Sequence, residues 1–438
     1  TLGALVASSM LTSGGSLQAA TPSVLPGGAA PDDEAHWRFV ADQFLIRSDV
    51  SYMNTGTRGP SPRSVYQAQI DAMTGYDTDR LSYVTHVNNS DYRTSVRHRL
   101  AAYVGAGADE IAFTNNTTEG MVIGTFGLDM KPGDEIVYTN HDHSSGGQPI
   151  HLRAARYGIK PVVVDLSDPG FHPPDHPDAI LKAFEKAITK KTRLISFCHV
   201  NYTDGCVMPV KQICELARER GIATLVDGAH PPGMMQLDLH DLGCDMYAGA
   251  CHKWMLASML TGFFYVRADM QERVWPTSYT GSVNGLNMYG VADSAAGIAR
   301  ANTAERYEMH GSRSDTAVPS IDAALAFHTG LGTAAIEARV RTLAGRARSG
   351  LAEIPGVRIH VSEDPAMSCG LVAFTLNGVK PKELADRLWT RHRIYIRDVS
   401  HPEIGWEVNR ASLHIMVRQT QLDSLIGAVR EIGTEVGA

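Results

Sequence analysis

Apolar residues in the middle of the chain form short runs that alternate with amphipathic stretches. Short apolar runs followed by turn residues are typical of buried strands, and apolar residues every three or four positions are typical of helices. We therefore expect a mostly parallel sheet with helices on both faces between Glu110 and Arg267. The expected strands are 110–114, 134–139, 161–165, 194–200, 222–226 and 245–250, and the expected helices are 179–188 and 209–221.

The flanking regions show a different pattern. Helical spacing appears at 34–44 and 95–103, and a stretch rich in Pro, Gly and Ala at 21–33 is typical of a linker. Towards the C-terminus the pattern predicts helices at 321–327 and 334–347 and strands at 357–361 and 370–376, which indicates a second, α+β domain. We expect an export-signal remnant and linker (1–30), an N-terminal segment packing on the small domain (31–65), a large domain (66–300) and a small domain (301–438).

Composition excludes several classes of protein. The 438 residues are 43% hydrophobic and 20% charged, which describes an ordinary globular chain long enough for two domains. The net charge is −7 and no basic block occurs, so nucleic-acid binding is not expected. The six cysteines show no Cys-x-x-Cys spacing, so we predict neither a metal site nor a disulfide framework. No apolar run reaches the roughly 18 residues that span a bilayer.

The N-terminal residues indicate export. Residues 1–11 are small and apolar, and residues 16–22 resemble a cleavage region. A floppy leader is the simpler alternative. We expect a periplasmic or otherwise exported protein, with a cytoplasmic location as the alternative.

Two strand ends carry the chemistry. Asp227 closes the run 222–226, and Lys253 follows the run 245–250. In an open α/β sheet the ends of neighbouring strands share one crevice. Pyridoxal phosphate (PLP) needs this pair, because a lysine holds it as a Schiff base and a carboxylate keeps its pyridine nitrogen protonated. By composition alone, a solvated surface lysine is the simpler interpretation.

The sequence motifs around this pair resemble those of a known family. Asp227-Gly228-Ala229-His230, His252-Lys253 and the segment 262–267 resemble the class V aminotransferases of the fold-type I PLP enzymes, in their isopenicillin N epimerase-like branch. The resemblance extends from about Tyr52 to the C-terminus. It implies an α/β fold with a large, mostly parallel sheet and a smaller α+β C-terminal domain, PLP as cofactor, and a homodimer with a shared active site.

The cofactor's phosphate has several candidate partners. The strand at 110–114 runs into Asn116, Thr117 and Thr118, and a helix start with nearby hydroxyls binds anions, although a plain helix cap uses the same residues. The resemblance implies that Thr117 and Thr118 bind the phosphate. By the same resemblance, His252 or backbone groups replace a phosphate donor, because this chain has Ala250 where desulfurases of the superfamily often have Ser. It also implies that Ser312 reaches the phosphate of the neighbouring subunit.

The resemblance also assigns the residues around the cofactor ring. It places Asp227 at the ring nitrogen, His230 near the ring oxygen, and His143 stacked on the ring with a role in proton transfer. His141 is the alternative to His143. Lys253, Asp227 and His143 are thus the candidate catalytic residues, with Lys253 as the general base on the substrate's Cα.

Substrate binding is expected at two ends of the chain. Arg410 matches the family's arginine for the substrate α-carboxylate, and a guanidinium suits that group, although pairing with a surface acid is the alternative. Arg58 and Asn54 lie in a segment that the family places at the mouth of the site. Tyr202 falls where the family carries Asn.

Three functions remain open from the sequence. Residues 394–409 contain no cysteine, so desulfurase chemistry is not expected. The first function is transamination, or a related change of an amino group, on an amino acid or a peptide-linked amine. A member of this family with an export signal resembles the periplasmic PLP enzymes that modify a side chain of the siderophore pyoverdine. Twin-arginine export suits such a protein, because it transports proteins that have already folded around a cofactor. The second is amino-acid epimerisation or C–S lysis, and the third is a non-catalytic PLP-fold binding protein.

Overall fold

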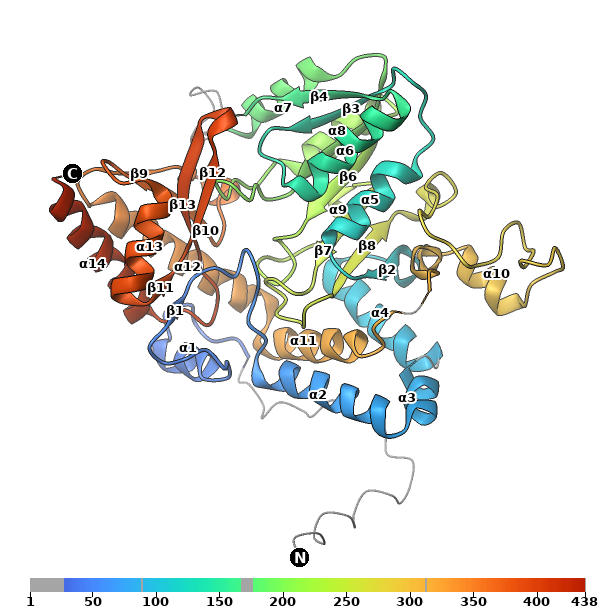
Figure 1. Cartoon of the computed structure of the whole chain (residues 1–438), viewed down its shortest axis with the longest axis horizontal. Helices are drawn as coiled ribbons and strands as arrows, with labels where there is room; N and C mark the ends of the chain where they lie inside the picture. The colour runs from blue at the N-terminus through green and yellow to red at the C-terminus, as the bar shows by residue number, and fades with distance from the viewer. Residues whose placement is uncertain (1–26, 88–89, 167–175, 312, 438) are drawn as a thin grey trace, which may run out of the picture.

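The computed structural model describes residues 27–87, 90–166, 176–311 and 313–437, and its largest sheet has seven strands in the order β2-β8-β7-β6-β5-β3-β4 (Figure 1). The strands from β3 to β7 run parallel, whereas β8 runs antiparallel to both β2 and β7. The mostly parallel sheet expected from the sequence is confirmed. The strands are β2 (Ile111–Thr114), β3 (Glu135–Thr139), β4 (Lys160–Val164), β5 (Thr192–Cys198), β6 (Ala223–Gly228), β7 (Met246–Ala250) and β8 (Gly262–Val266).

Helices cover both faces of this sheet. Successive strand residues point to opposite faces, so Val226 and Phe263 pack in one apolar cluster while Leu225 and Phe264 pack in another. Burial on both faces explains why these strands are nearly unbroken apolar runs. The first cluster includes α4 (Ser90–Val104), α7 (Pro177–Ala187), α8 (Val210–Glu219) and α11 (Ala317–Leu331), and the second includes α5 (Thr117–Gly127) and α6 (Ser144–Tyr157).

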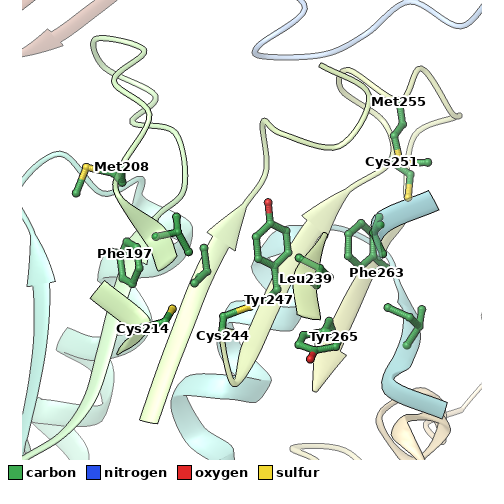
Figure 2. Close-up of a cluster of buried hydrophobic side chains, with 14 of the residues drawn as sticks. Phe197, Met208, Cys214, Leu239, Cys244, Tyr247, Cys251, Met255, Phe263 and Tyr265 are labelled. Atoms are coloured by element: carbon green, nitrogen blue, oxygen red, sulfur yellow. The ribbon is translucent and has the colours of Figure 1, made fainter. Parts of the chain in front are cut away.

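The first cluster is rich in aromatic rings and sulfur, as Figure 2 shows. The rings of Tyr247 and Phe263 stack with their centroids 6.2 Å apart. Cys214 and Cys244 lie in the same cluster, and all six cysteines of the chain are buried and free. Their distribution agrees with a role in packing.

A second sheet forms the C-terminal part of the molecule. Its four strands are antiparallel in the order β12-β13-β10-β9. Three helices pack on one face, and the other face carries Val399, Trp406 and Val408, against which Tyr202 packs. The elements are β9 (Val357–Ile359), β10 (Leu371–Leu376), β12 (Arg397–His401), β13 (Trp406–Ser412), α12 (Thr333–Ala352), α13 (Pro381–His392) and α14 (Gln419–Val436).

The N-terminal segment lies against this C-terminal part (Figure 1). After α1 (Glu34–Ala41), the short strand β1 (Ser51–Tyr52) pairs in parallel with β11 (Ile394–Tyr395). The helices α2 (Arg63–Thr78) and α3 (Arg80–Val87) then lead to α4. The helix α10 (Ala295–Ala301) belongs to an excursion that projects from the body of the molecule (Figure 1).

Several expected boundaries are wrong by a few residues. The helix expected at 34–44 ends at Ala41, and the helix expected at 321–327 extends from Ala317 to Leu331. An apolar stripe marks the buried face of a helix and not its capping residues, so the ends are the least determined part. The division into domains at residues 65 and 300 stays a prediction. Within the described residues, no helix has the length and apolar character that crossing a membrane requires.

Candidate active site

A cleft of about 820 Å³ opens where the parallel strands end, and the hairpin β12–β13 forms its opposite wall. Its size is that of an ordinary cofactor or ligand site. The cleft is lined by residues that follow the strands β2, β3, β5, β6 and β7, as expected for an α/β sheet. Among the predicted site residues, the lining contains Arg58, Thr117, Thr118, His143, Tyr202, His230, His252, Lys253 and Arg410.

Asp227 is the next-to-last residue of β6 and is 4% exposed. Its Oδ1 accepts a hydrogen bond from the Ala229 N–H at 3.0 Å, and the Ser145 hydroxyl lies 3.2 Å from Oδ2. Both donor residues line the cleft. The carboxylate is therefore held in one orientation next to the cleft by these two hydrogen bonds.

Lys253 lies three residues beyond the end of β7, the strand that pairs with β6. Burial lowers the pKa of Lys253 to about 8, and the Asp227 carboxylate opposes this shift. A minor fraction of the Lys253 side chains is thus neutral at pH 7, and this fraction rises to about half at pH 8. The neutral amine is the form that attacks a carbonyl group or accepts a proton.

The backbone around Lys253 is fixed by a close approach of the N-terminal segment. The Gly59 N–H donates to the carbonyl oxygen of His252 at 3.0 Å. A Cβ on Gly59 would lie 1.8 Å from the carbonyl oxygen of Lys253, so this contact requires glycine. The turn 54–59 thereby joins the lysine loop to the N-terminal segment.

Two histidines follow β3, and the structure separates them. His143 lines the cleft, where its ring meets that of Tyr202 edge-on with centroids 4.9 Å apart. His141 is fully buried and its Nδ1 lies 2.6 Å from the Thr203 hydroxyl. Of the two alternatives left open by the sequence, His143 is the one that the fold places at the cleft. Its role over the cofactor ring stays a prediction.

His143 is fixed as the N-cap of α6. Its Nδ1 accepts from the Ser145 N–H at 3.1 Å, and the Ser145 hydroxyl lies 2.8 Å from the same atom. Burial lowers the pKa of His143, although Asp227 opposes the shift. Ser145, which holds the His143 ring, also contacts the Asp227 carboxylate.

Two further histidines of the cleft are oriented by neighbours. Trp254 Nε1 donates to Nδ1 of His230 at 3.1 Å, so the proton of the neutral ring lies on Nε2. Burial holds the pKa of His230 well below its usual value. His252 Nδ1 donates to the carbonyl oxygen of Thr261 at 2.9 Å, which leaves Nε2 as an acceptor.

The helix α5 presents its N-terminus to the cleft. Gly120 and Gly124 allow α5 to lie directly on the sheet, because a Cβ there would lie 2.7 Å from Ala248 and from Leu225, respectively. The Asn116 side chain caps the helix at the Glu119 N–H (3.0 Å). The hydroxyl of Thr117 is buried and has no hydrogen-bond partner among the described residues. The first turn thus offers N–H groups and a free hydroxyl.

Arg410 extends from β13 into the cleft and is 3% exposed. Its guanidinium donates to the carbonyl oxygen of Tyr202 and lies 3.5 Å from the Thr57 hydroxyl, and its Nε has no partner. Burial lowers the pKa of Arg410 to about 10. No carboxylate among the described residues pairs with it, which leaves it available for an acidic ligand.

Other predicted residues have different positions. Arg58 lines the cleft, whereas Asn54 is buried behind it and accepts a hydrogen bond from Thr57 at 2.9 Å. Ser312 lies outside the described residues. Sequence reasoning missed Ser145 and Arg397. The small polar run after His143 was a usable signal for Ser145, whereas the position of Arg397 depends on a hairpin that no local pattern predicts.

The sequence model of the aminotransferase class-V family matches residues 54–425. The chain belongs to the class V aminotransferase family. The chain is 29% identical to isopenicillin N epimerase of Streptomyces clavuligerus, over 90% of this chain and 98% of that protein. It is 26% identical to a probable cysteine desulfurase of Methanothermobacter thermautotrophicus, over 89% of this chain and 96% of that protein.

Solved structures agree on the fold. A mutant of C-DES with glycine linked to its PLP cofactor superimposes with a TM-score of 0.78 at 24% identity, over 89% of this chain and 98% of that one. The cysteine desulfurase of Thermococcus onnurineus superimposes with a TM-score of 0.79 at 22% identity, over 94% of this chain and 100% of that one. The fold-type I architecture is confirmed.

As a class V family member, the protein is a PLP-dependent enzyme, and its residues fit that cofactor. The unpartnered Thr117 hydroxyl and the start of α5 suit a phosphate group, and the buried Asp227 carboxylate suits a protonated pyridine nitrogen. Lys253, with its pKa lowered to about 8, suits covalent attachment. These residues, with Thr118 and His252 at the rim, are the ones we expect to hold PLP.

Proposed function

We propose that this enzyme transaminates, or closely modifies the amino group of, an amino acid or a peptide-linked amine. One observation carries the proposal: Lys253 and Arg410 line the same cleft and the Asp227 carboxylate lies beside it, so a base, a carboxylate-binding group and a partner for the cofactor ring share one site. Burial raises the pKa of Tyr202, which lines the same cleft, to about 12. Transamination requires a base that both removes and returns a proton, and Lys253 can serve as that base.

The chain's own residues support this sequence of events. Arg410 binds the substrate carboxylate and Lys253 Nζ takes the proton from Cα. Bound PLP supplies the electron sink for the pair left on Cα. Asp227 is held by its bonds to Ala229 and Ser145, and His143 lies in ring contact with Tyr202. Lys253 then returns the proton, and the position to which it returns decides the reaction.

Thiol chemistry is not part of the proposal. Cysteine is absent from the described lining of the cleft. Cys198, at the end of β5 next to Asp227, is 3% exposed, and burial holds the pKa of its thiol well above its usual value. A thiol is nucleophilic as the thiolate, so a buried thiol with a raised pKa is a poor nucleophile.

Epimerisation is the second candidate, and the similarity to isopenicillin N epimerases favours it. It requires a second group that delivers a proton from the side opposite Lys253. Tyr202 is the candidate for that group because its hydroxyl contacts His401, which in turn contacts Glu403 at 3.0 Å.

A single-turnover experiment separates the candidates. The purified holoenzyme is mixed with amino acids and amine-bearing peptides, while cofactor absorbance and product mass are followed. Transamination predicts an absorbance change that persists until an oxo acid is added, together with an oxo product. Return of the original absorbance with inverted substrate would replace transamination by epimerisation. The Lys253→Ala variant should lose the response, whereas an absence of turnover in the native protein as well would indicate a binding protein instead.

We further propose that the enzyme acts outside the cytoplasm on a siderophore of the pyoverdine type. The apolar residues 1–11 and the cleavage-like residues 16–22 support export, and the cleft is large enough for a peptide-linked substrate. Gene deletion should change the mass of the siderophore side chain, and fractionation should place the protein in the periplasm. An unaltered siderophore would contradict the assignment.

We also propose a homodimer. The excursion around α10 exposes apolar side chains, and exposed apolar patches mark interaction surfaces. The patch comprises Trp275 (52% exposed), Val283 (51%), Leu286 (44%), Met288 (87%), Tyr289 (79%) and Val291 (56%). Sedimentation should give a dimer that the double change Met288→Glu and Tyr289→Asp dissociates. The control Leu45→Glu alters a residue that is 50% exposed outside the patch and should leave the dimer intact.

A further inference from the structure

Arg397 and Arg410 lie directly opposite each other across the antiparallel pair β12–β13. Opposite residues of such a pair point to the same face of the sheet, and both arginines line the cleft. Like charges in this arrangement destabilise a hairpin. The sheet keeps an unfavourable pair at the cleft, which calls for a compensating negative group.

The protein supplies no such group among the described residues. Within residues 27–87, 90–166, 176–311 and 313–437, no ion pair joins Arg397 or Arg410 to a carboxylate. The pKa of Arg410 is lowered to about 10, first by burial and then by the charge of Arg397. The two guanidinium groups therefore repel each other, and nothing in the described cleft neutralises them.

The carboxylates near the cleft do not neutralise these two arginines, because they bind other groups or point in another direction. Both oxygens of Asp142 accept backbone N–H groups, those of Thr139 and Cys198, each at 2.7 Å. Glu403 is bound by His401 Nδ1 at 3.0 Å. Asp398 also belongs to the lining of the cleft, but it follows Arg397 along β12, where successive side chains point to opposite faces, and it forms no ion pair with either arginine in the described part of the chain.

We infer that Arg397 binds a second carboxylate of the substrate, so that the substrate is an amino acid, free or peptide-linked, with an additional acidic group. This rests on the proposed function, in which Arg410 binds the first carboxylate. An acid at each arginine removes the repulsion between them. Guanidinium groups bind carboxylates through paired hydrogen bonds, which suits recognition of two acidic ends at a fixed spacing. Arg58 is separate, because its charge acts on His252 at the cofactor side of the cleft.

The test uses ligands without an amine, so it is independent of the reaction. Binding of glutarate and butyrate to the holoenzyme is measured by calorimetry at low ionic strength, since exposed charges are screened by salt. Glutarate should bind at least about tenfold more tightly than butyrate, because charge-assisted hydrogen bonds supply at least that factor. Arg397→Gln should abolish the difference and leave butyrate binding unchanged, whereas Arg397→Lys should restore part of it.

Matched variants make the outcome decisive. Arg410→Gln should weaken both ligands, and Arg58→Gln should leave the preference for glutarate intact. Equal weakening of both ligands by Arg397→Gln would mean that the two arginines share one carboxylate, and no effect would mean that Arg397 is merely solvated. Either result overturns the inference. A preference for glutarate without turnover of any amino acid would overturn only the proposed function.

Discussion

The N–H of Gly59 donates to the carbonyl oxygen of His252 at 3.0 Å, which joins the N-terminal segment to the loop that carries Lys253. The contact brings two backbones together, so there is no flexible side chain that can move away. A turn far from Lys253 in the sequence therefore determines where the lysine lies.

Gly59→Ala should destabilise the protein by about 1–3 kcal/mol, as overpacking of a well-packed interior does. The added Cβ would lie 1.8 Å from the Lys253 carbonyl oxygen, so the lysine loop must shift and PLP should bind more weakly. Denaturant unfolding and cofactor titration measure both effects. The control is Gly345→Ala in α12, where a Cβ meets nothing within 4 Å and should stabilise by about 0.5–1 kcal/mol. Normal PLP affinity in Gly59→Ala would contradict the role of this contact.

The reactivity of Lys253 should depend on pH with a midpoint near 8. Burial lowers its pKa to about 8, so in the PLP-free protein the nucleophilic neutral amine accumulates as pH rises through that value. Labelling by an amine-specific reagent, followed by peptide mass spectrometry, gives the midpoint.

Asp227→Asn should move that midpoint to lower pH, because the Asp227 carboxylate raises the pKa of Lys253. Lys211, whose pKa is raised by its bond to Asp241, serves as the internal control and should react only at higher pH. A shift of the Lys253 midpoint to higher pH in Asp227→Asn would refute the proposed coupling.

Glu308→Gln should destabilise the protein by about 3–5 kcal/mol, the cost of breaking a buried ion pair. Glu308 contacts Arg97 and Arg93 and accepts the Phe113 N–H at 2.6 Å. The control Glu305→Gln removes a partly exposed acid, 3.4 Å from Arg97, and should cost less than about 1 kcal/mol. Equal losses would show that burial of the pair is unimportant.

The same pair determines an acid dependence of stability. Burial alone would raise the pKa of Glu308, but Arg97 and Arg93 outweigh it and hold the pKa well below its usual 4.5. A carboxylate with a depressed pKa stabilises above its unfolded value, so this contribution should be lost as pH falls below about 4.5. Urea unfolding of Glu308→Gln should show a weaker decline than the native protein in that range.

Tyr202→Phe should lower the free energy of unfolding by about 0.5–1.5 kcal/mol, because it removes the hydrogen bond to His401. This bond joins the loop after β5 to the end of β12. The ring contact with His143 is kept in this variant, so the effect reports the hydroxyl alone. Tyr395→Phe, at a side chain that is 41% exposed, is the control and should be neutral. A neutral Tyr202→Phe would mean that this bond does not hold the β12–β13 wall in place.

Local pattern was sufficient for the large sheet and for the central pair of site residues. The apolar run 222–226 predicts a strand that ends near Asp227, and the motif around Lys253 predicts a loop. Because β6 and β7 are parallel and adjacent, their ends lie at the same edge of the sheet. Family membership follows from the same residues, because they carry the chemistry directly. The domain boundaries and the individual roles of the site residues stay predictions.

The sequence by itself determined the mostly parallel fold, through apolar periodicity, and the cofactor, through the family resemblance of the motifs around Asp227 and Lys253. Only the tertiary structure decided that His143 and not His141 lines the cleft, that Asn54 lies behind it, and that Arg397 faces the site beside Arg410. These positions depend on which distant strands pair and on how the N-terminal turn packs. Such contacts leave no period in the local sequence, because they arise from packing between segments that are not neighbours in the chain, or from the pairing of the two strands of a hairpin.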